Sequence, residues 1–191
     1  MRIVGGSLKG RRLIPPDDRQ VRPTSDRTRE ALFNILAHGD FGDFDLEGAR
    51  VLDLFAGTGA LGFEALSRGA RFCLFVDDAA SSRALIRRNA EELGLMGACK
   101  IYRRDAARLG TRPGSVGPAF DLLFADPPYG KGFGSDALDG ALAGGWLRAG
   151  ALAILEETAE AELVIPAGYE LLDQRRYGDT QIAILRVLTL S

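Results

Sequence analysis

The pattern of apolar and polar residues changes character near residue 50. From there on, short and almost wholly apolar runs alternate with segments whose apolar residues recur every three or four positions. Runs of the first kind predict buried strands, and segments of the second kind predict amphipathic helices. The expected strands are 51–55, 72–76, 100–103, 120–125 and 151–156, and the expected helices are 59–68, 79–93 and 136–147.

Strands and helices that alternate in this way indicate an α/β fold around a parallel sheet. Nearly all-apolar strands must be covered on both faces, as in doubly wound folds. Two further strands, 169–177 and 181–188, flank Gly178-Asp179 and predict an antiparallel hairpin at the C-terminal end. Ligands of such folds bind beyond the carboxyl ends of the parallel strands, which directs attention to those ends.

The first 40 residues follow another pattern and predict a small extension. Two short extended runs, 2–5 and 11–14, flank a glycine-containing turn and predict a hairpin. After them, Thr24 or Ser25 is expected to cap a helix that ends near Ala37. The expected division of the chain is therefore an extension over 1–40 and a main domain over 41–191.

Charge distinguishes the extension further, although the formal net charge of the chain is only −2. Residues 1–29 hold eight of the 24 Lys and Arg residues and three of the 26 Asp and Glu residues, so this segment is net +5. The rest, with 16 basic and 23 acidic residues, is net −7. A basic segment on an acidic body suits a phosphate-binding element, and a solvated charged surface is the alternative.

Composition indicates an ordinary soluble protein, with 46% hydrophobic residues and no apolar run of the ~20 residues that a membrane span needs. The first residues contain no apolar signal-peptide core, so we expect a cytoplasmic protein that contacts no membrane. Cys73 and Cys99 lie in apolar stretches and match no metal-ligand spacing. We expect them to be small buried residues, and we expect no metal site.

The most informative loop is Gly57-Thr-Gly-Ala-Leu-Gly62, which fits the G-x-G-x-x-G pattern of a dinucleotide-binding turn. Asp77 follows Gly57 by 20 positions, where such a turn has its ribose-binding carboxylate. The glycines alone leave a dinucleotide and S-adenosylmethionine equally open. Asp53 would repel a pyrophosphate by about 4 kcal/mol at ~4 Å, whereas it would attract an ammonium group. We therefore expect S-adenosylmethionine, with Asp53 at its amino-acid end, Asp77 at the ribose and Asp105 at the adenine.

A second motif, Asp126-Pro-Pro-Tyr129, directly follows the expected strand 120–125. A structural turn is the plain alternative, because consecutive prolines end a strand in any case. The motif nevertheless suits methylation of a base amino group, whose lone pair is delocalised and weakly nucleophilic. Asp126 and the Pro127 carbonyl, which Pro128 helps to orient, would each accept one N–H hydrogen bond and favour a pyramidal nitrogen. The ring of Tyr129, rather than its hydroxyl, would stack on an unpaired or flipped base.

These segments resemble a known family. VLDLFAGTGALGFEAL and DPPY resemble class I methyltransferases that act on base amino groups, while MRIVGGSLKGRRL, RPTSDRTREALFNIL and RYGDT are similar to segments of the bacterial RsmD family. The resemblance covers essentially the whole chain. It implies a Rossmann-like class I methyltransferase fold: a seven-stranded, mostly parallel sheet with a C-terminal antiparallel hairpin and a small N-terminal hairpin and helix extension. The implied reaction methylates N2 of one guanine in 16S ribosomal RNA, with S-adenosyl-L-methionine as donor and S-adenosylhomocysteine as product.

The resemblance also assigns residues to the site. It implies cofactor contacts at Asp53, Phe55, Ala56, Gly57, Gly59, Asp77, Asp105 and Ala106, a base-amino site at Asp126, Pro127, Pro128 and Tyr129, and RNA contacts at Lys9, Arg11, Arg12, Arg22 and Arg27. One departure concerns the ribose, because the family usually has Glu where this chain has Asp77-Asp78. We expect Asp77 to make the contact, since it directly continues the strand. Arg22 has an alternative role at the methionine carboxylate.

Several readings of the function stay open. A DNA adenine-N6 methyltransferase shares DPPY but has a separate recognition domain for which this chain has little room. A non-catalytic ribosome-assembly factor would not need both motifs, and a nicotinamide oxidoreductase would need a proton-transfer residue that the sequence does not offer. The expected partner is 16S rRNA in the small ribosomal subunit or its assembly intermediate, and the expected state is a monomer. The sequence leaves open whether free RNA or a particle is the substrate.

Overall fold

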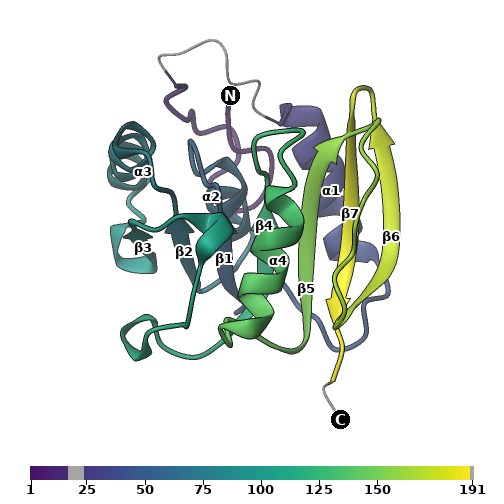
Figure 1. Cartoon of the computed structure of the whole chain (residues 1–191). Helices are drawn as coiled ribbons and strands as arrows, with labels where there is room; N and C mark the ends of the chain where they lie inside the picture. The colour runs from purple at the N-terminus through teal and green to yellow at the C-terminus, as the bar shows by residue number, and fades with distance from the viewer. Residues whose placement is uncertain (17–23, 190–191) are drawn as a thin grey trace.

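A computed structural model describes residues 1–16 and 24–189 of the chain. Its centre is a seven-stranded sheet in the order β3-β2-β1-β4-β5-β7-β6 (Figure 1). Strands β1 to β5 run parallel to one another, β7 runs antiparallel to β5, and β6 runs antiparallel to β7. The predicted class I architecture is therefore confirmed. The strands are β1 (Arg50–Leu54), β2 (Phe72–Val76), β3 (Cys99–Tyr102), β4 (Phe120–Ala125), β5 (Leu147–Thr158), β6 (Tyr169–Tyr177) and β7 (Thr180–Val187).

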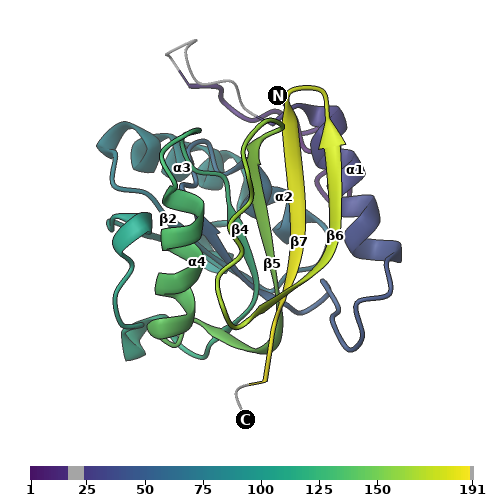
Figure 2. The ribbon, with the colours of Figure 1, turned by 45° about the vertical axis from the view of Figure 1, so that its right-hand side comes forward.

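Helices cover both faces of the sheet, as the apolar strands require. Successive strand residues point to opposite faces, so that Val51 belongs to one buried cluster and Leu52 to the other. The first cluster packs under α1 (Asp26–His38), α2 (Ala60–Ser67) and α3 (Ala80–Leu93), and the second packs under α4 (Phe133–Ala143). Figure 2 shows α4 on the face opposite α2 and α3. Cys73 and Cys99 are free and buried, as predicted.

The N-terminal extension packs directly on the main domain. Its hairpin is short: Arg2 and Arg12 form a single antiparallel bridge, and the N–H of Ile3 donates to the Arg11 carbonyl at 2.9 Å. Ile3 and Leu13 are buried in the cluster that also contains α2 and α3 residues. The predicted helix cap is confirmed, because the Ser25 hydroxyl accepts a hydrogen bond from the N–H of Thr28 at 3.0 Å. The extension therefore shares its apolar core with the sheet.

The predicted bounds of α4 and β5 differ most from the structure: the strand expected over 151–156 spans Leu147–Thr158. The helix expected over 136–147 begins at Phe133 and ends at Ala143, and Leu147 already belongs to β5. Two glycines end the helix, since Gly145 adopts a left-handed conformation with φ +69°. A Cβ on Gly144 would lie 2.1 Å from the Gly110 carbonyl oxygen, so this close turn requires glycine.

Candidate functional site

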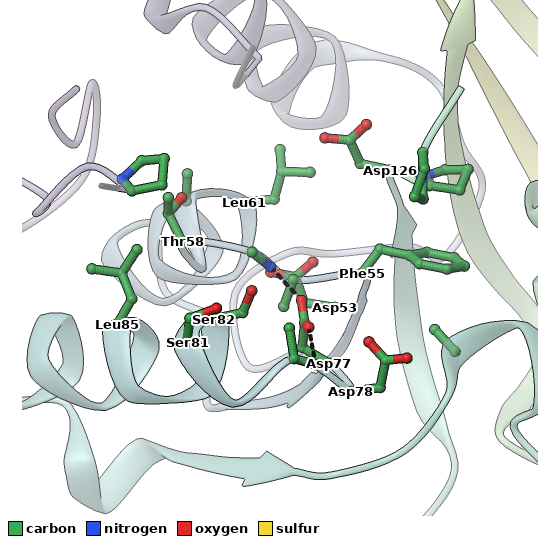
Figure 3. Close-up of a pocket in the computed structure, with 18 of the residues that line it drawn as sticks. Asp53, Phe55, Thr58, Leu61, Asp77, Asp78, Ser81, Ser82, Leu85 and Asp126 are labelled. Carbon is green, nitrogen blue, oxygen red and sulfur yellow. Dashed lines mark hydrogen bonds between the residues drawn. The ribbon is translucent and has the colours of Figure 1, made fainter. Parts of the chain in front are cut away.

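A large cavity lies at the carboxyl ends of the parallel strands, with a volume of about 1050 Å³. This volume slightly exceeds the range of roughly 300–1,000 Å³ for small-molecule sites, so the cavity has room for a cofactor and a second reactant. Figure 3 shows Asp77 and Asp78 on one side of it and Asp126 on the other, with Phe55 between them. The predicted residues that line it are Asp53, Phe55, Ala56, Gly57, Asp77, Asp105, Ala106, Asp126, Pro127, Pro128 and Tyr129.

The end of β2 holds the glycine loop that follows β1. One carboxylate oxygen of Asp77 accepts a hydrogen bond from the N–H of Gly57 at 2.9 Å, and the other accepts from the N–H of Ala79, also at 2.9 Å. Gly57 has φ +56°, a conformation that favours glycine. Asp77 thus connects the loop to the start of α3 while it faces the cavity (Figure 3).

Gly59 has a different position from its neighbours in the loop. It is not among the residues that line the cavity, and it adopts φ +80° directly before α2. A Cβ at this position would lie 2.5 Å from the Phe63 ring and 3.2 Å from the Phe75 ring. The glycine therefore permits the turn and the close packing behind the loop, rather than facing the cavity.

Asp53 is an almost completely buried carboxylate in the floor of the cavity, with 2% of its surface exposed. It accepts a hydrogen bond from the N–H of Gly62 at 3.0 Å. Burial raises the pKa of Asp53 well above its usual range, and the nearby charge of Asp77 raises it further. A cation bound in the cavity would stabilise the ionised form of Asp53.

Two further carboxylates continue this wall of the cavity. Asp78 is exposed and lines the cavity beside Asp77. Asp105 accepts a hydrogen bond from the N–H of Ala107 at 2.9 Å, which fixes the short turn after β3. Both Asp77 and Asp78 can face a ribose, and Asp77 stays our prediction for that contact.

The charge of the cavity lining is strongly one-sided. Within the described part of the chain, five aspartates line it, and Arg88 is the one Arg or Lys among the lining residues. A pyrophosphate would meet this acidic surface with little compensation, whereas a ligand with an ammonium or sulfonium group would be attracted. The residues present therefore fit S-adenosylmethionine and do not fit a dinucleotide.

The loop after β4 forms the other half of the site. Burial raises the pKa of Asp126 well above its usual range, and the charges of Glu156, Asp53 and Glu157 add to this effect, while a hydrogen bond from Thr24 opposes it. Tyr129 is 41% exposed, and its hydroxyl donates to Glu156 at 3.1 Å. The motif thus presents a carboxyl group inside the cavity and an aromatic ring at its opening.

Two polar residues beside the cavity escaped the sequence analysis. Glu156, at 5% exposure, follows the apolar run of β5 and accepts a hydrogen bond from Thr24 at 2.6 Å. Asn89, at 1% exposure, accepts from the N–H of Ile14 at 2.8 Å and donates to the Thr58 carbonyl at 3.1 Å. A signal for Asn89 was available, because it falls on the buried stripe of α3.

The basic residues of the extension separate into two groups. Lys9, Arg11, Arg12 and Arg27 are exposed, and Arg11 donates to the Glu92 carbonyl of α3 at 2.5 Å. Arg22 lies outside the described residues, so neither of its expected roles is tested.

Arg29 is instead fully buried. Its Nε lies 3.5 Å from the buried Glu64 carboxylate, and it also pairs with Asp26 at 2.8 Å. Arg29 thus holds α1 to α2 and is unavailable to RNA.

None of the helices in the described ranges, 1–16 and 24–189, is both long and apolar enough to cross a bilayer.

Comparisons with known proteins agree on the family. A family model described as Conserved hypothetical protein 95 matches residues 1–186. The chain is 36% identical to ribosomal RNA small subunit methyltransferase D of Escherichia coli (strain K12), over 93% of this chain and 85% of that protein. It is 30% identical to the protein of the same name from Haemophilus influenzae, over 93% and 89% of the two chains.

A solved structure supports the same assignment. The Escherichia coli protein yhhF, described as a proposed methyltransferase, superimposes with a TM-score of 0.81 and 30% identity, and the match covers 98% of each chain. The fold, the family model and the relatives all coincide over almost the whole chain. The chain therefore belongs to the Conserved hypothetical protein 95 family, which is the RsmD family.

Proposed function

We propose that this protein transfers a methyl group from S-adenosyl-L-methionine to the exocyclic N2 amino group of a guanine in 16S rRNA of the small ribosomal subunit. The observation that carries the proposal is the shared cavity, where Asp53 and Asp77 lie on the side of the glycine loop and Asp126 lies at the end of β4. The names of two relatives, ribosomal RNA small subunit methyltransferase D, support rRNA as the substrate class.

The glycine-loop half of the cavity would hold the cofactor. The buried Asp53 carboxylate would pair with the ammonium group of the methionine end, which relieves the burial of an uncompensated charge. Asp77 or its neighbour Asp78 would accept hydrogen bonds from the ribose hydroxyls, and Asp105 would accept from the adenine amino group. When bound, the cofactor supplies a methyl group on a sulfonium, which is an electrophile that needs no further activation.

The half of the cavity beside β4 would hold the guanine. Tyr129 would stack on the base at the opening, a contact of about 1–3 kcal/mol for one base on one aromatic ring. Asp126 and the Pro127 carbonyl would each accept one N–H bond of the amino group. These two acceptors would direct the nitrogen lone pair away from the ring plane and toward the methyl carbon.

In the proposed reaction the amino nitrogen would bond to the methyl carbon as the carbon–sulfur bond breaks, and the sulfur would keep the electron pair, which leaves the thioether S-adenosylhomocysteine. The nitrogen then carries a positive charge and must lose one proton. A carboxylate at hydrogen-bond distance can accept it, and the raised pKa of Asp126 suits this role.

The exposed basic residues of the extension, Lys9, Arg11, Arg12 and Arg27, would contact RNA phosphates. Their chemistry provides affinity without base specificity, because phosphate contacts carry no sequence information. Arg22, which lies outside the described residues, is proposed to contact RNA as well. We further propose that the enzyme acts as a cytoplasmic monomer, with residues 1–40 as the RNA-binding extension and 41–191 as the catalytic domain.

The test is transfer of tritiated methyl groups to 16S rRNA and to small subunits from cells that lack this protein and, in parallel, to DNA, followed by nucleoside analysis. The proposal predicts N2-methylguanosine in RNA as the labelled product. Labelled N6-methyladenine in DNA would instead support the alternative DNA enzyme. Cofactor binding without any labelled nucleoside would support a non-catalytic assembly factor.

A further inference from the structure

Glu156 is a buried carboxylate at a point where four elements of the chain meet. It lies in β5 with 5% of its surface exposed. One oxygen accepts a hydrogen bond from the Tyr129 hydroxyl at 3.1 Å, and the other accepts from the Thr24 hydroxyl at 2.6 Å. Thr180, in β7, lies 3.5 Å from the same Tyr129 hydroxyl. The Glu156 side chain thus connects Tyr129, in the loop after β4, to Thr24, the residue before the N-cap of α1.

Each contact fixes something that the methyl transfer would need. Tyr129 is 41% exposed, so packing alone confines its ring weakly, and the hydrogen bond from its hydroxyl to Glu156 restricts the plane in which the ring can stack. Thr24 directly precedes Ser25, the N-cap of α1. The hydrogen bond to Thr24 therefore fixes the start of α1 relative to the loop after β4. It thereby also fixes the position of the exposed Arg27, which lies in the first turn of α1.

Stability alone gives a poor reason for a carboxylate at this position. Burying a charge carries a large desolvation penalty, and an apolar residue of similar volume is often at least as stable. The location is also acidic already, since Glu156 raises the pKa of the neighbouring Asp126. The next residue, Glu157, is equally buried at 8% but accepts from the N–H of the adjacent Thr158 at 2.8 Å, which is a local contact.

We propose that Glu156 is a positioning residue for the methyl transfer: it clamps the Tyr129 hydroxyl and the start of α1 to β5, so that the stacking ring and the RNA-binding extension have one fixed orientation. The inference rests on the proposed function and deepens it. It also changes the expectation for Tyr129, because the sequence assigned importance to the ring alone, whereas the hydroxyl now has a partner.

The test compares Glu156→Ala, Glu156→Gln and the matched control Glu157→Gln. The glutamine carbonyl can accept a hydrogen bond from one hydroxyl, and its amide N–H can donate to the oxygen of the other hydroxyl. Alanine removes both hydrogen bonds. We expect Glu156→Ala to lower kcat/KM for RNA at least tenfold while cofactor affinity stays within threefold. Above the acid limb of the pH–rate profile, where Asp126 is ionised in every variant, we expect Glu156→Gln to retain at least a third of the rate and Glu157→Gln to stay within twofold of the wild type.

A double-mutant cycle separates positioning from general damage. If Tyr129→Phe and Glu156→Ala remove the same hydrogen bond, the double variant should be little less active than Glu156→Ala alone. Effects that multiply, or a Glu156→Ala variant with wild-type kcat and KM, would overturn the proposal. A Glu156→Gln variant as impaired as Glu156→Ala would also overturn it, because the hydrogen bonds would then not be the cause.

A readout independent of activity keeps the inference testable if the proposed function fails. Fluorine NMR of protein labelled with 3-fluorotyrosine, with the Tyr129 signal assigned by its absence in Tyr129→Phe, reports on the mobility of this ring. We expect the Tyr129 signal to narrow and shift toward the solvent-exposed value in Glu156→Ala and not in Glu157→Gln. An unchanged signal would refute the clamp, whereas an absence of methyl transfer by the wild type would refute only the proposed function.

Discussion

Asp77, at the end of β2, accepts a hydrogen bond from the N–H of Gly57 at 2.9 Å and so holds the loop that follows β1. The two residues are 20 positions apart in the chain, and the parallel pairing of β1 with β2 brings them together. The same carboxylate faces the cavity (Figure 3). One side chain therefore shapes the glycine loop and is also available to a ligand.

This relationship predicts that Asp77→Ala lowers the affinity for S-adenosylmethionine by at least tenfold, because the substitution removes both the support of the loop and the proposed ribose acceptor. Asp78→Ala, at the exposed neighbour, should lower it by no more than threefold. Isothermal titration calorimetry with both variants and the wild type measures this. A larger effect for Asp78→Ala would assign the ribose contact to Asp78.

The acid limb of the pH–rate profile should reflect Asp126. Burial and the charges of Glu156, Asp53 and Glu157 raise the pKa of this carboxyl, and the hydrogen bond from Thr24 only partly opposes the shift. The ionised form is the hydrogen-bond acceptor, so kcat/KM should fall as the pH drops through a pKa well above the ordinary value of about 3.9 for Asp. In Glu156→Gln, which removes one negative charge, the limb should move to lower pH. A limb at the same pH in that variant would show that Glu156 does not act on Asp126.

The basic extension should contribute affinity for RNA and little to the chemistry. Replacing Arg11 and Arg12 with Ala should weaken RNA binding and reduce its log–log salt slope by about 0.7–0.9 for each phosphate that is no longer neutralised. Cofactor affinity should be unchanged. The control is Arg71→Ala. Arg71 is exposed and directly precedes β2, so it lies at the amino ends of the parallel strands, away from the cavity at their carboxyl ends. An unchanged slope in the double variant would reduce these residues to a solvated surface.

Glu64 should matter for stability rather than for catalysis. Its carboxylate is fully buried, lies 3.5 Å from the buried Arg29 and 2.8 Å from Arg68, and accepts from the N–H of Val4 at 2.9 Å. Removing it leaves Arg29 with the partly exposed Asp26 as its carboxylate partner, and breaking a buried ion pair in this way typically costs about 3–5 kcal/mol. Urea unfolding of Glu64→Ala against the exposed control Glu47→Ala measures this difference. A decrease in stability below about 1 kcal/mol would mean that Arg29 finds other partners.

The sequence predicted those features that depend on local pattern and on parallel topology. The bounds expected for β2 and β4 coincide with the observed strands because β2 is a wholly apolar run between Arg71 and Asp77, and β4 is apolar apart from Asp121 and ends before Asp126-Pro127. The sequence also predicted that Asp53, Asp77 and Asp126 lie near one another, because all three are at or near the carboxyl ends of parallel strands, which meet on the same side of the sheet. The end of α4 was missed because the helical spacing continued past the two glycines that end it.

What the sequence could not predict depends on contacts between distant segments. Thr24 and Glu156 are 132 residues apart, and their contact depends on how α1 packs beside β5. Arg29 was counted with the basic residues of segment 1–29 by charge alone, although it shares the buried stripe of α1 with Leu32, Phe33 and Leu36. That spacing was a usable signal, because residues three, four and seven positions apart lie on one helix face. Charge without the helix face does not distinguish a structural arginine from an exposed one.

The central claim is that one cavity holds a cofactor on the side of the glycine loop and a base amino group at Asp126. Its most direct test is Asp126→Ala, measured for tritiated methyl transfer to 16S rRNA and, in parallel, for calorimetric binding of S-adenosylmethionine. We predict that transfer falls below detection while cofactor affinity stays within threefold of the wild type. Retained methyl transfer, or an equal decrease in cofactor affinity, would contradict the assignment of Asp126 to the base.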